Sequence, residues 1–309
     1  MRPERTTFAG FTPEDINRDF GADIAIIGIP YGVSYQPGEL SPSHHAPESI
    51  RAESMRYPED VHSWDFDLNG TLLKESSLNV VDLGDLVGDA HDPEGNRKRG
   101  MKAVGKILRR GALPVVLGGD DSIPLMAFEA FKGMRDIQIL QIDAHIDWRD
   151  EVGGITHGFS SPMRRASELP WIKGITQVGA RGTGTARKQE YEHALAYGAR
   201  IISAYDLHRF GVDYALEAVQ ENLSCFVTID CDGLDPACMP AVMSPAPGGV
   251  TYYQMLDLLR GVHQKAGLAG LSVVEFVPHK DINHFGAITA MRIIWNFIGQ
   301  IGRENKRDK

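Results

Sequence analysis

Short apolar runs alternate with longer amphipathic stretches along most of the chain. The apolar runs are rich in β-branched residues and have the length of buried strands. They span residues 22–30, 78–85, 113–120, 137–144, 175–182, 199–204, 223–232 and 268–276. Between them, apolar residues recur at helical spacing over 93–111, 122–132, 187–198, 213–222, 251–266 and 284–300. This alternation predicts an α/β fold with helices on both faces of a mostly parallel sheet.

Helix starts and irregular stretches refine this picture. Ser122 and Thr251 each precede an amphipathic stretch, so both are predicted N-caps. The longest irregular stretches are 31–77 and 148–174. In open α/β sheets such loops gather beyond the carboxyl ends of strands, where ligands bind. We find no linker or internal repeat in the sequence and therefore predict one domain over residues 1–309.

Ionisable side chains follow four of the apolar runs. They are Asp120 and Asp121 in LGGDDS, Asp143, His145 and Asp147 in QIDAHID, Asp230, Asp232 and Asp235 in TIDCDGLD, and Glu275 in SVVEF. A single Asp after a strand is usually a helix cap or a turn residue, and we interpret Asp235 in that way. Side chains at spacing two point to one face of an extended chain. The DAHID and DCD motifs therefore gather acids on one face and predict a functional cleft.

Several carboxylates gathered at buried strand ends need compensating positive charge. Five acids and a histidine in one cleft require at least two positive charges. Oxygen-rich ligation with one imidazole suits manganese best, with nickel, iron or zinc as alternatives. Two such ions held by bridging carboxylates would activate a water molecule as a nucleophile at neutral pH.

The composition excludes several other classes of protein. A net charge of -9 argues against a general nucleic-acid or anionic-membrane surface. We find no apolar stretch of the roughly 18 or more residues that a membrane span requires. The charged residues at the start of the sequence are not followed by an apolar run, so we do not expect them to form a secretory signal. The three cysteines are too few for a disulfide scaffold, which favours free thiols in the cytoplasm.

The motifs GGDDS, DAHID, DCDGLDP, SPAPGG and VVEF, in this order, resemble the signatures of the ureohydrolase family of arginases, agmatinases and guanidinobutyrases. The resemblance extends from IIGIPYG and APESIR to VVEFVPHKD and is closer to the agmatinase branch. It implies an arginase-like fold, a three-layer α/β/α sandwich that forms one ureohydrolase-like catalytic domain. It also implies a homo-oligomer, either a trimer or a hexamer.

The resemblance further implies a centre of two divalent ions, manganese first and nickel as an alternative. Asp143 and Asp230 would bridge the two metals, while His145 and Asp232 would complete one site. Asp147 would serve the other site, together with Asp121.

The resemblance implies a reaction as well. Glu275 would hold the guanidinium group of a small cationic substrate, with Ser244 as a second substrate-binding residue. Metal-bridging hydroxide would attack the guanidinium carbon and release urea and an amine. Asp147 would stabilise the intermediate and pass its proton to the leaving amine.

Three features depart from the family pattern. Asp121 stands where the family usually has a metal-binding histidine, which predicts weaker binding of transition metals or a changed metal preference. His157 is the candidate for the family's proton-shuttling histidine, but it lies two residues further from PMRR than that histidine does, and Phe159 stands in its column. The loop that bears His44 and His45 is longer than usual, and we expect it to shape substrate choice.

Several functions stay open at this point. Agmatine is the first expected substrate, followed by guanidinobutyrate, guanidine or a methylated guanidine, and formimino-group hydrolysis would use the same chemistry. An ammonium tail needs nearby acids and a carboxylate tail needs basic residues. The candidate loops offer both, namely Glu39, Glu151, Arg149, Arg164 and Arg181. The alternative from another class is a non-catalytic subunit that binds a regulator or pairs with an active paralogue.

Overall fold

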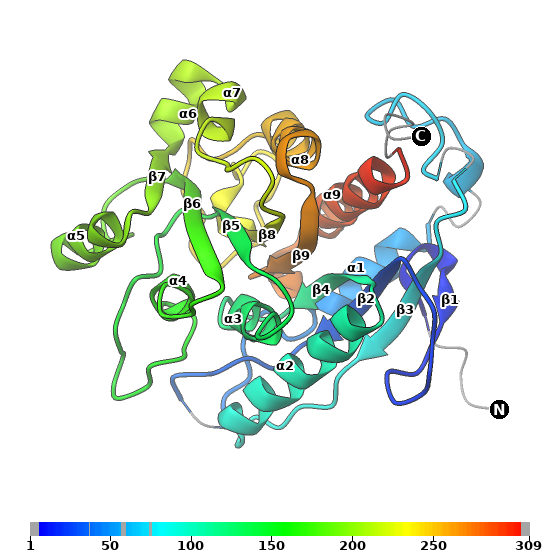
Figure 1. Ribbon diagram of the computed structural model, residues 1–309, viewed down its shortest axis with the longest axis horizontal. Helices are drawn as coiled ribbons and strands as arrows, with labels where there is room; N and C mark the ends of the chain where they lie inside the picture. The colour runs from blue at the N-terminus through cyan, green and yellow to red at the C-terminus, as the bar shows by residue number, and fades with distance from the viewer. Residues whose placement is uncertain (1–5, 37, 57–59, 74–75, 304–309) are drawn as a thin grey trace.

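A computed structural model describes residues 6–36, 38–56, 60–73 and 76–303 of the chain. Within these residues, nine strands form one sheet in the order β1-β3-β2-β4-β9-β8-β5-β6-β7, and each neighbouring pair is parallel (Figure 1). The strands are β1 (Thr12–Pro13), β2 (Ile24–Ile29), β3 (Val80–Asp85), β4 (Leu113–Gly118), β5 (Ile137–Ile142), β6 (Ile172–Ala180), β7 (Arg200–Ser203), β8 (Cys225–Asp230) and β9 (Leu268–Val274).

Helices follow most of the strands. They are α1 (Ala46–Ser54), α2 (Pro93–Arg109), α3 (Ile123–Ala130), α4 (Pro162–Ala166), α5 (Lys188–Tyr197), α6 (Ala204–Phe210), α7 (Val212–Leu216), α8 (Tyr252–Ala266) and α9 (Phe285–Ile301). Short 3-10 turns are η1 (Phe8–Gly10), η2 (Asp60–His62), η3 (Cys231–Gly233) and η4 (Pro278–Lys280).

Two apolar layers, one on each face of the sheet, hold these elements together. Alternate residues of a strand point to opposite faces, so Ile24 and Ile26 of β2 pack in the layer of α1, α8 and α9. Ala25 and Ile27 pack in the layer of α2 and α3 instead. Figure 1 shows the two sets of helices on opposite sides of the strands. The expected three-layer α/β/α architecture is therefore confirmed.

All eight predicted strands are present, and β1, with only two residues, was missed. The predicted helix over 213–222 is shorter than expected and ends at Leu216. Helices α1, α4 and α6 were also missed, and α1 shows why. Its buried face includes Arg51, whose guanidinium donates to Asp82 on β3 at 2.8 Å. A charged residue on the buried side hides the apolar periodicity that reveals a helix.

The two predicted N-caps differ. Thr251 accepts a hydrogen bond from Gln254 N and forms a capping box at the start of α8, as predicted. Ser122 occupies the N-cap position of α3, as predicted, but its side chain makes no capping hydrogen bond. The Ser122 hydroxyl instead donates to Asp120 and accepts from Val33 N at 2.7 Å. It therefore joins the loop after β2 to the end of β4 rather than capping the helix.

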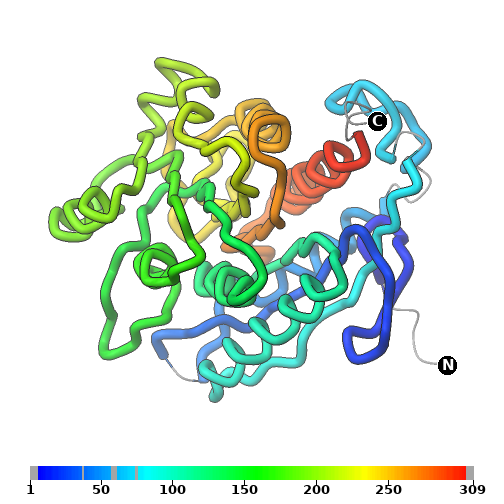
Figure 2. Tube along the Cα trace, in the orientation of Figure 1, coloured from blue at the N-terminus to red at the C-terminus, as the bar shows by residue number. Residues whose placement is uncertain are grey.

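The sheet order brings the acidic motifs together. Strands β4, β9, β8 and β5 are consecutive neighbours in the sheet, and each precedes one of the four motifs. Because the strands are parallel, their carboxyl ends lie along one edge. The loop after β2 and the loop after β5 also meet there (Figure 2). Ser160 N of the second loop donates to Tyr35 Oη of the first at 3.0 Å. None of the helices formed by the described residues is long and apolar enough to cross a membrane.

Candidate metal centre and active-site cleft

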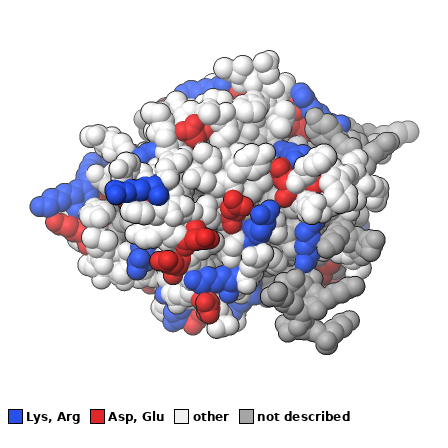
Figure 3. All heavy atoms as spheres, turned by 90° about the horizontal axis from the view of Figure 1, so that it is seen from above, with Lys and Arg blue, Asp and Glu red and all other residues white. Residues whose placement is uncertain are grey.

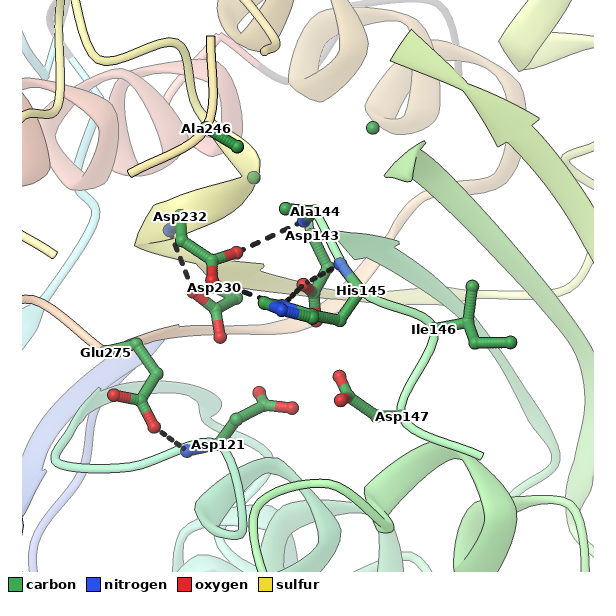
Figure 4. Close-up of polar contacts among 12 residues, drawn as sticks. Asp121, Asp143, Ala144, His145, Ile146, Asp147, Asp230, Asp232, Ala246 and Glu275 are labelled. Atoms are coloured by element: carbon green, nitrogen blue, oxygen red, sulfur yellow. Dashed lines mark hydrogen bonds and ion pairs between the residues drawn. The ribbon is translucent and has the colours of Figure 1, made fainter. Parts of the chain in front are cut away.

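Asp143, His145 and Asp232 form the first of two groups of potential metal ligands (Figure 4). One ligand atom from each residue lies within 4.8 Å of the others. His145 Nδ1 lies 3.3 Å from Asp143 Oδ1 and 3.2 Å from Asp232 Oδ2. Hydrogen bonds to Asp143 and then to Asp232 raise the pKa of His145 to about 11. In the metal-free protein, His145 is thus protonated, because the carboxylates of Asp143 and Asp232 stabilise a positive charge between them.

Asp121, Asp143 and Asp230 form the second group, again with ligand atoms within 4.8 Å of one another. Asp143 belongs to both groups, so its carboxylate lies between them. Both carboxylate oxygens of Asp121 are buried, and neither has a hydrogen-bond partner among the described residues. Burial, followed by the charges of Asp147 and Asp143, raises the pKa of Asp121 well above its usual value. Buried oxygens without partners fit a bound cation, because a cation supplies the compensation that the protein lacks.

Asp147 lies beside these groups and lines the same cleft. Its Oδ2 accepts from Gln141 Nε2 at 2.8 Å, and the same amide donates to Asp143 Oδ2 at 2.6 Å. Burial and then the charge of Asp143 raise the pKa of Asp147 well above its usual value. Asp147 has a φ of 51°, which is uncommon outside glycine. The side chain is thus held in place by both the backbone and a buried amide.

Two glutamines support the carboxylates, and the sequence reasoning missed both. Gln177 on β6 donates to Gln141 and to Ile146 O, and it accepts from Trp148 Nε1 at 2.8 Å. Both glutamines are buried within mostly apolar strands. A polar residue inside an apolar strand was the signal that could have revealed them, because a buried amide needs partners.

Glu275 follows β9 and faces the acidic groups from the other side (Figure 4). Its Oε1 accepts from Asp121 N at 3.0 Å, and its Oε2 accepts from Ser43 Oγ at 3.1 Å. Burial and then the charge of Asp120 raise the pKa of Glu275 to about 8. Its φ of 59° makes it a second site residue with positive φ. Such backbone outliers recur where a fold fixes a functional side chain.

Arg181 anchors the loop that carries Asp232. Its guanidinium donates six hydrogen bonds to five backbone carbonyls, from Gly179, Asp232, Gly233, Leu234 and Ala246. The shortest joins Nη2 to Asp232 O at 2.7 Å. One side chain thereby ties the end of β6 to the loop after β8.

The cleft above these residues has a volume of about 500 Å³. Its lining includes Asp121, His145, Asp147, Asp230, Asp232, Ser244 and Glu275. Seven of the lining residues are exposed, namely Gln36, Glu39, Leu40, Pro42, Phe159, Met243 and Ser244. We call four of them the cleft mouth: Glu39, Leu40, Phe159 and Met243. Phe159 is thus in the cleft, in the column where the family usually has a histidine.

Other residues singled out in the sequence lie elsewhere. Within the described part of the chain, His157 is not among the lining residues, and its Nδ1 lies 2.8 Å from Thr156 Oγ1. His44 and His45 are likewise outside the lining, and their rings contact each other. Asp235 accepts from Ala237 N at 2.9 Å at the start of the turn over 236–238, which confirms it as a turn residue. Cys231 is buried in the apolar core, and all three cysteines are free thiols.

Comparisons with known proteins agree with this geometry. A model of the arginase family matches residues 22–299. The chain belongs to the arginase family. An agmatinase from Chromobacterium violaceum is 30% identical to it over 301 residues, which cover 93% of this chain and 87% of that protein. A mitochondrial guanidino acid hydrolase from Homo sapiens is 29% identical over 292 residues, which cover 90% and 78%.

Solved structures give the same result. The proclavaminate amidino hydrolase from Streptomyces clavuligerus superposes on this chain with a TM-score of 0.82 at 27% identity, covering 98% of each chain. The predicted membership of the ureohydrolase family, with an agmatinase-like sequence, is therefore confirmed. In this arginase-family chain, the two acidic groups are the candidate sites of a binuclear metal centre.

Proposed function

We propose that this chain hydrolyses a small guanidino compound to urea and an amine with the help of two divalent cations. One observation carries the proposal: five acids and one histidine from three separate loops converge at a single cleft, opposite the half-buried Glu275. Membership of the arginase family supports it. Agmatine is the first substrate that we expect, and manganese is the first metal, with nickel as the alternative.

Different residues of the chain would bind the two cations. His145 and Asp232 would hold one ion and Asp121 and Asp230 the other, with Asp143 shared between them and Asp147 alongside. When bound, the two ions neutralise the carboxylates and activate water as a nucleophile near neutral pH. Arg181 keeps the Asp232 loop in position by holding its backbone carbonyls.

The substrate would lie between the acidic groups and Glu275. A guanidinium group is planar and donates paired hydrogen bonds, which suits the carboxylate of Glu275. Asp147 would take up a proton at its carboxylate and pass it to the leaving amine, because Gln141 orients one of its oxygens and burial favours the protonated acid. The proposed mechanism assigns no step to His157, since Phe159 and Ser160 are the residues of that loop that line the cleft.

Metal content and urea release together test this proposal. The protein is reconstituted with manganese and separately with nickel, the bound metal is measured by elemental analysis, and urea release is assayed on a panel of guanidino and formimino compounds. We expect about two ions per chain and urea from at least one guanidino compound. Substoichiometric metal and no urea from any compound would reject the proposal and favour a non-catalytic subunit, for which Asp121 in place of a histidine is the motivating observation.

A further inference from the structure

We infer that the cleft selects guanidino compounds whose tail, the part beyond the guanidinium, is cationic or uncharged, and that it rejects carboxylate tails. The inference rests on the proposed function, because it takes the guanidinium to be bound by Glu275. It concerns the chemistry of the cleft mouth, which neither family membership nor the metal ligands determine. The names of the relatives include both an agmatinase and a guanidino acid hydrolase, so ancestry leaves the charge of the tail open.

The charged side chains that line the cleft are almost all acidic. They are Glu39, Asp120, Asp121, Asp147, Asp230, Asp232 and Glu275, with His145 as the single histidine among the lining residues that the structure describes. Lysine and arginine are absent from this described lining. Bound cations would offset the deep carboxylates, whereas Glu39 is exposed at the cleft mouth, away from the candidate ligands. A substrate carboxylate at the mouth would thus meet another carboxylate and no basic partner.

The three arginines that could have accepted a carboxylate tail are engaged elsewhere. Arg149 lies 3.6 Å from Glu190, at the start of α5. Arg164 lies 3.8 Å from Asp150 and 3.7 Å from Glu168. Arg181 holds the five carbonyls of the loops behind Asp232. On the face shown in Figure 3, basic and acidic side chains are interspersed rather than gathered in a basic patch.

One part of the wall near the cleft mouth is aromatic and apolar, and it lies in the same lining as the polar but uncharged Gln36, Ser41 and Ser244. The rings of Tyr35 and Phe159 lie 4.4 Å apart between centroids. Tyr35 is fixed from two sides, since its hydroxyl accepts from Ser160 N at 3.0 Å and a Cβ on Gly158 would come within 2.1 Å of its ring. Only a glycine at position 158 leaves room for this contact. Leu40 and Met243 are 45% and 49% exposed and complete the apolar surface.

This surface determines which tails are favoured. A methylene chain gains from contact with Tyr35, Phe159, Leu40 and Met243 by the hydrophobic effect. An ammonium group gains further from the aromatic faces and from Glu39. A carboxylate loses water at the same place, where the described lining offers only neutral donors such as Gln36 and Ser244 and no positive charge to replace it. Tyr35, Glu39, Phe159 and Met243 are therefore specificity-determining residues.

Three ligands of similar length isolate the charge of the tail: agmatine with an ammonium tail, 1-butylguanidine with a methyl tail, and 4-guanidinobutyrate with a carboxylate tail. Their dissociation constants are measured by calorimetry on the metal-loaded full chain, and urea release is followed in parallel. We expect 4-guanidinobutyrate to bind about tenfold or more weakly than 1-butylguanidine, and agmatine to bind at least as tightly as 1-butylguanidine, because one partly exposed charge interaction shifts affinity by about that factor.

Variants of the cleft mouth sharpen the test. Met243→Arg supplies the missing positive charge and should improve 4-guanidinobutyrate binding about tenfold relative to agmatine, whereas the uncharged control Met243→Gln should leave the ranking as it is. Glu39→Gln should bring the dissociation constant of agmatine closer to that of 1-butylguanidine. Both positions are exposed, so the fold tolerates these changes.

Binding and turnover separate the two proposals. Selective binding of the cationic and uncharged ligands without urea from any of them would reject the proposed hydrolysis and support the inferred selectivity. Equal or tighter binding of 4-guanidinobutyrate by the unchanged chain would overturn the inferred selectivity, even if urea is released. Failure of all three ligands to bind would overturn it as well.

Discussion

Replacing Glu275 by glutamine should make the metal-free protein more stable and the enzyme inactive. The substitution keeps the shape of the side chain and both of its hydrogen bonds. Its carbonyl can accept from Asp121 N, and the Ser43 hydroxyl can turn from donor to acceptor for the new amide. What disappears is a buried negative charge among other acids.

The size of the effect follows from the pKa of Glu275, which rises from 4.5 to about 8 in the folded protein. Because the folded value lies above the unfolded one, the metal-free protein loses stability as the pH rises from about 4.5 and stops losing it near 8. Each pKa unit corresponds to about 1.4 kcal/mol, so Glu275→Gln should raise the free energy of unfolding by about 3 kcal/mol at pH 7 and about 5 kcal/mol above pH 8. Near pH 4.5 the two proteins should be equally stable.

Denaturant unfolding of the metal-free proteins, followed by circular dichroism at several pH values, measures this difference. The matched control is Glu39→Gln, which neutralises an exposed carboxylate of the same cleft and should change stability by less than about 0.5 kcal/mol at every pH. In the metal-loaded enzyme, Glu275→Gln should lower kcat/KM for urea release at least about 100-fold, because the guanidinium loses its anionic partner. A stability difference that does not change with pH would refute the assignment of a buried, protonated Glu275.

Other predictions concern the ligands and their support. Asp230→Ala should abolish binding of the cation that Asp121 and Asp230 would hold, and with it activity, while the circular dichroism spectrum is kept. Full activity would contradict the binuclear centre. Asp121→His should keep two cations and change the manganese-to-nickel activity ratio, whereas complete inactivity would show that the carboxylate itself is required. Arg181→Met should weaken metal affinity about 10- to 100-fold. Unchanged affinity in a metal titration would show that Arg181 does not position the loop that carries Asp232. Because the pKa of His145 is raised to about 11, it should stay protonated to pH 9 by NMR in the metal-free protein, and metal binding at pH 7 should release its proton.

The pattern of the sequence was enough to determine the alternating strands and helices. An apolar, β-branched run such as 137–144 is stable only when both of its faces are buried in a sheet, so the local sequence is enough to predict the strand. The spacing of DAHID and DCD located the acids but did not fix their directions, because neither motif is an extended strand: Asp232 lies in the 3-10 turn η3, and Asp147 has a φ of 51°. Helix α1 was not predicted, because Arg51 lies on its buried side. The carboxylates that compensate the buried charge of Arg51, those of Asp82 and Asp85, are more than 30 residues away in the sequence.

Only the tertiary structure decided which of the charged residues share a cleft. Glu39 and Arg181 were equal candidates in the sequence, because both lie in loops after parallel strands. The folded chain places Glu39 at the cleft mouth and turns Arg181 toward five backbone carbonyls behind Asp232. The order of the strands in the sheet, set by packing between distant segments, determines which loops meet. The motifs that supply the proposed metal ligands could thus be located in the sequence, whereas the charge of the surface that meets the substrate's tail depends on contacts that local spacing does not encode.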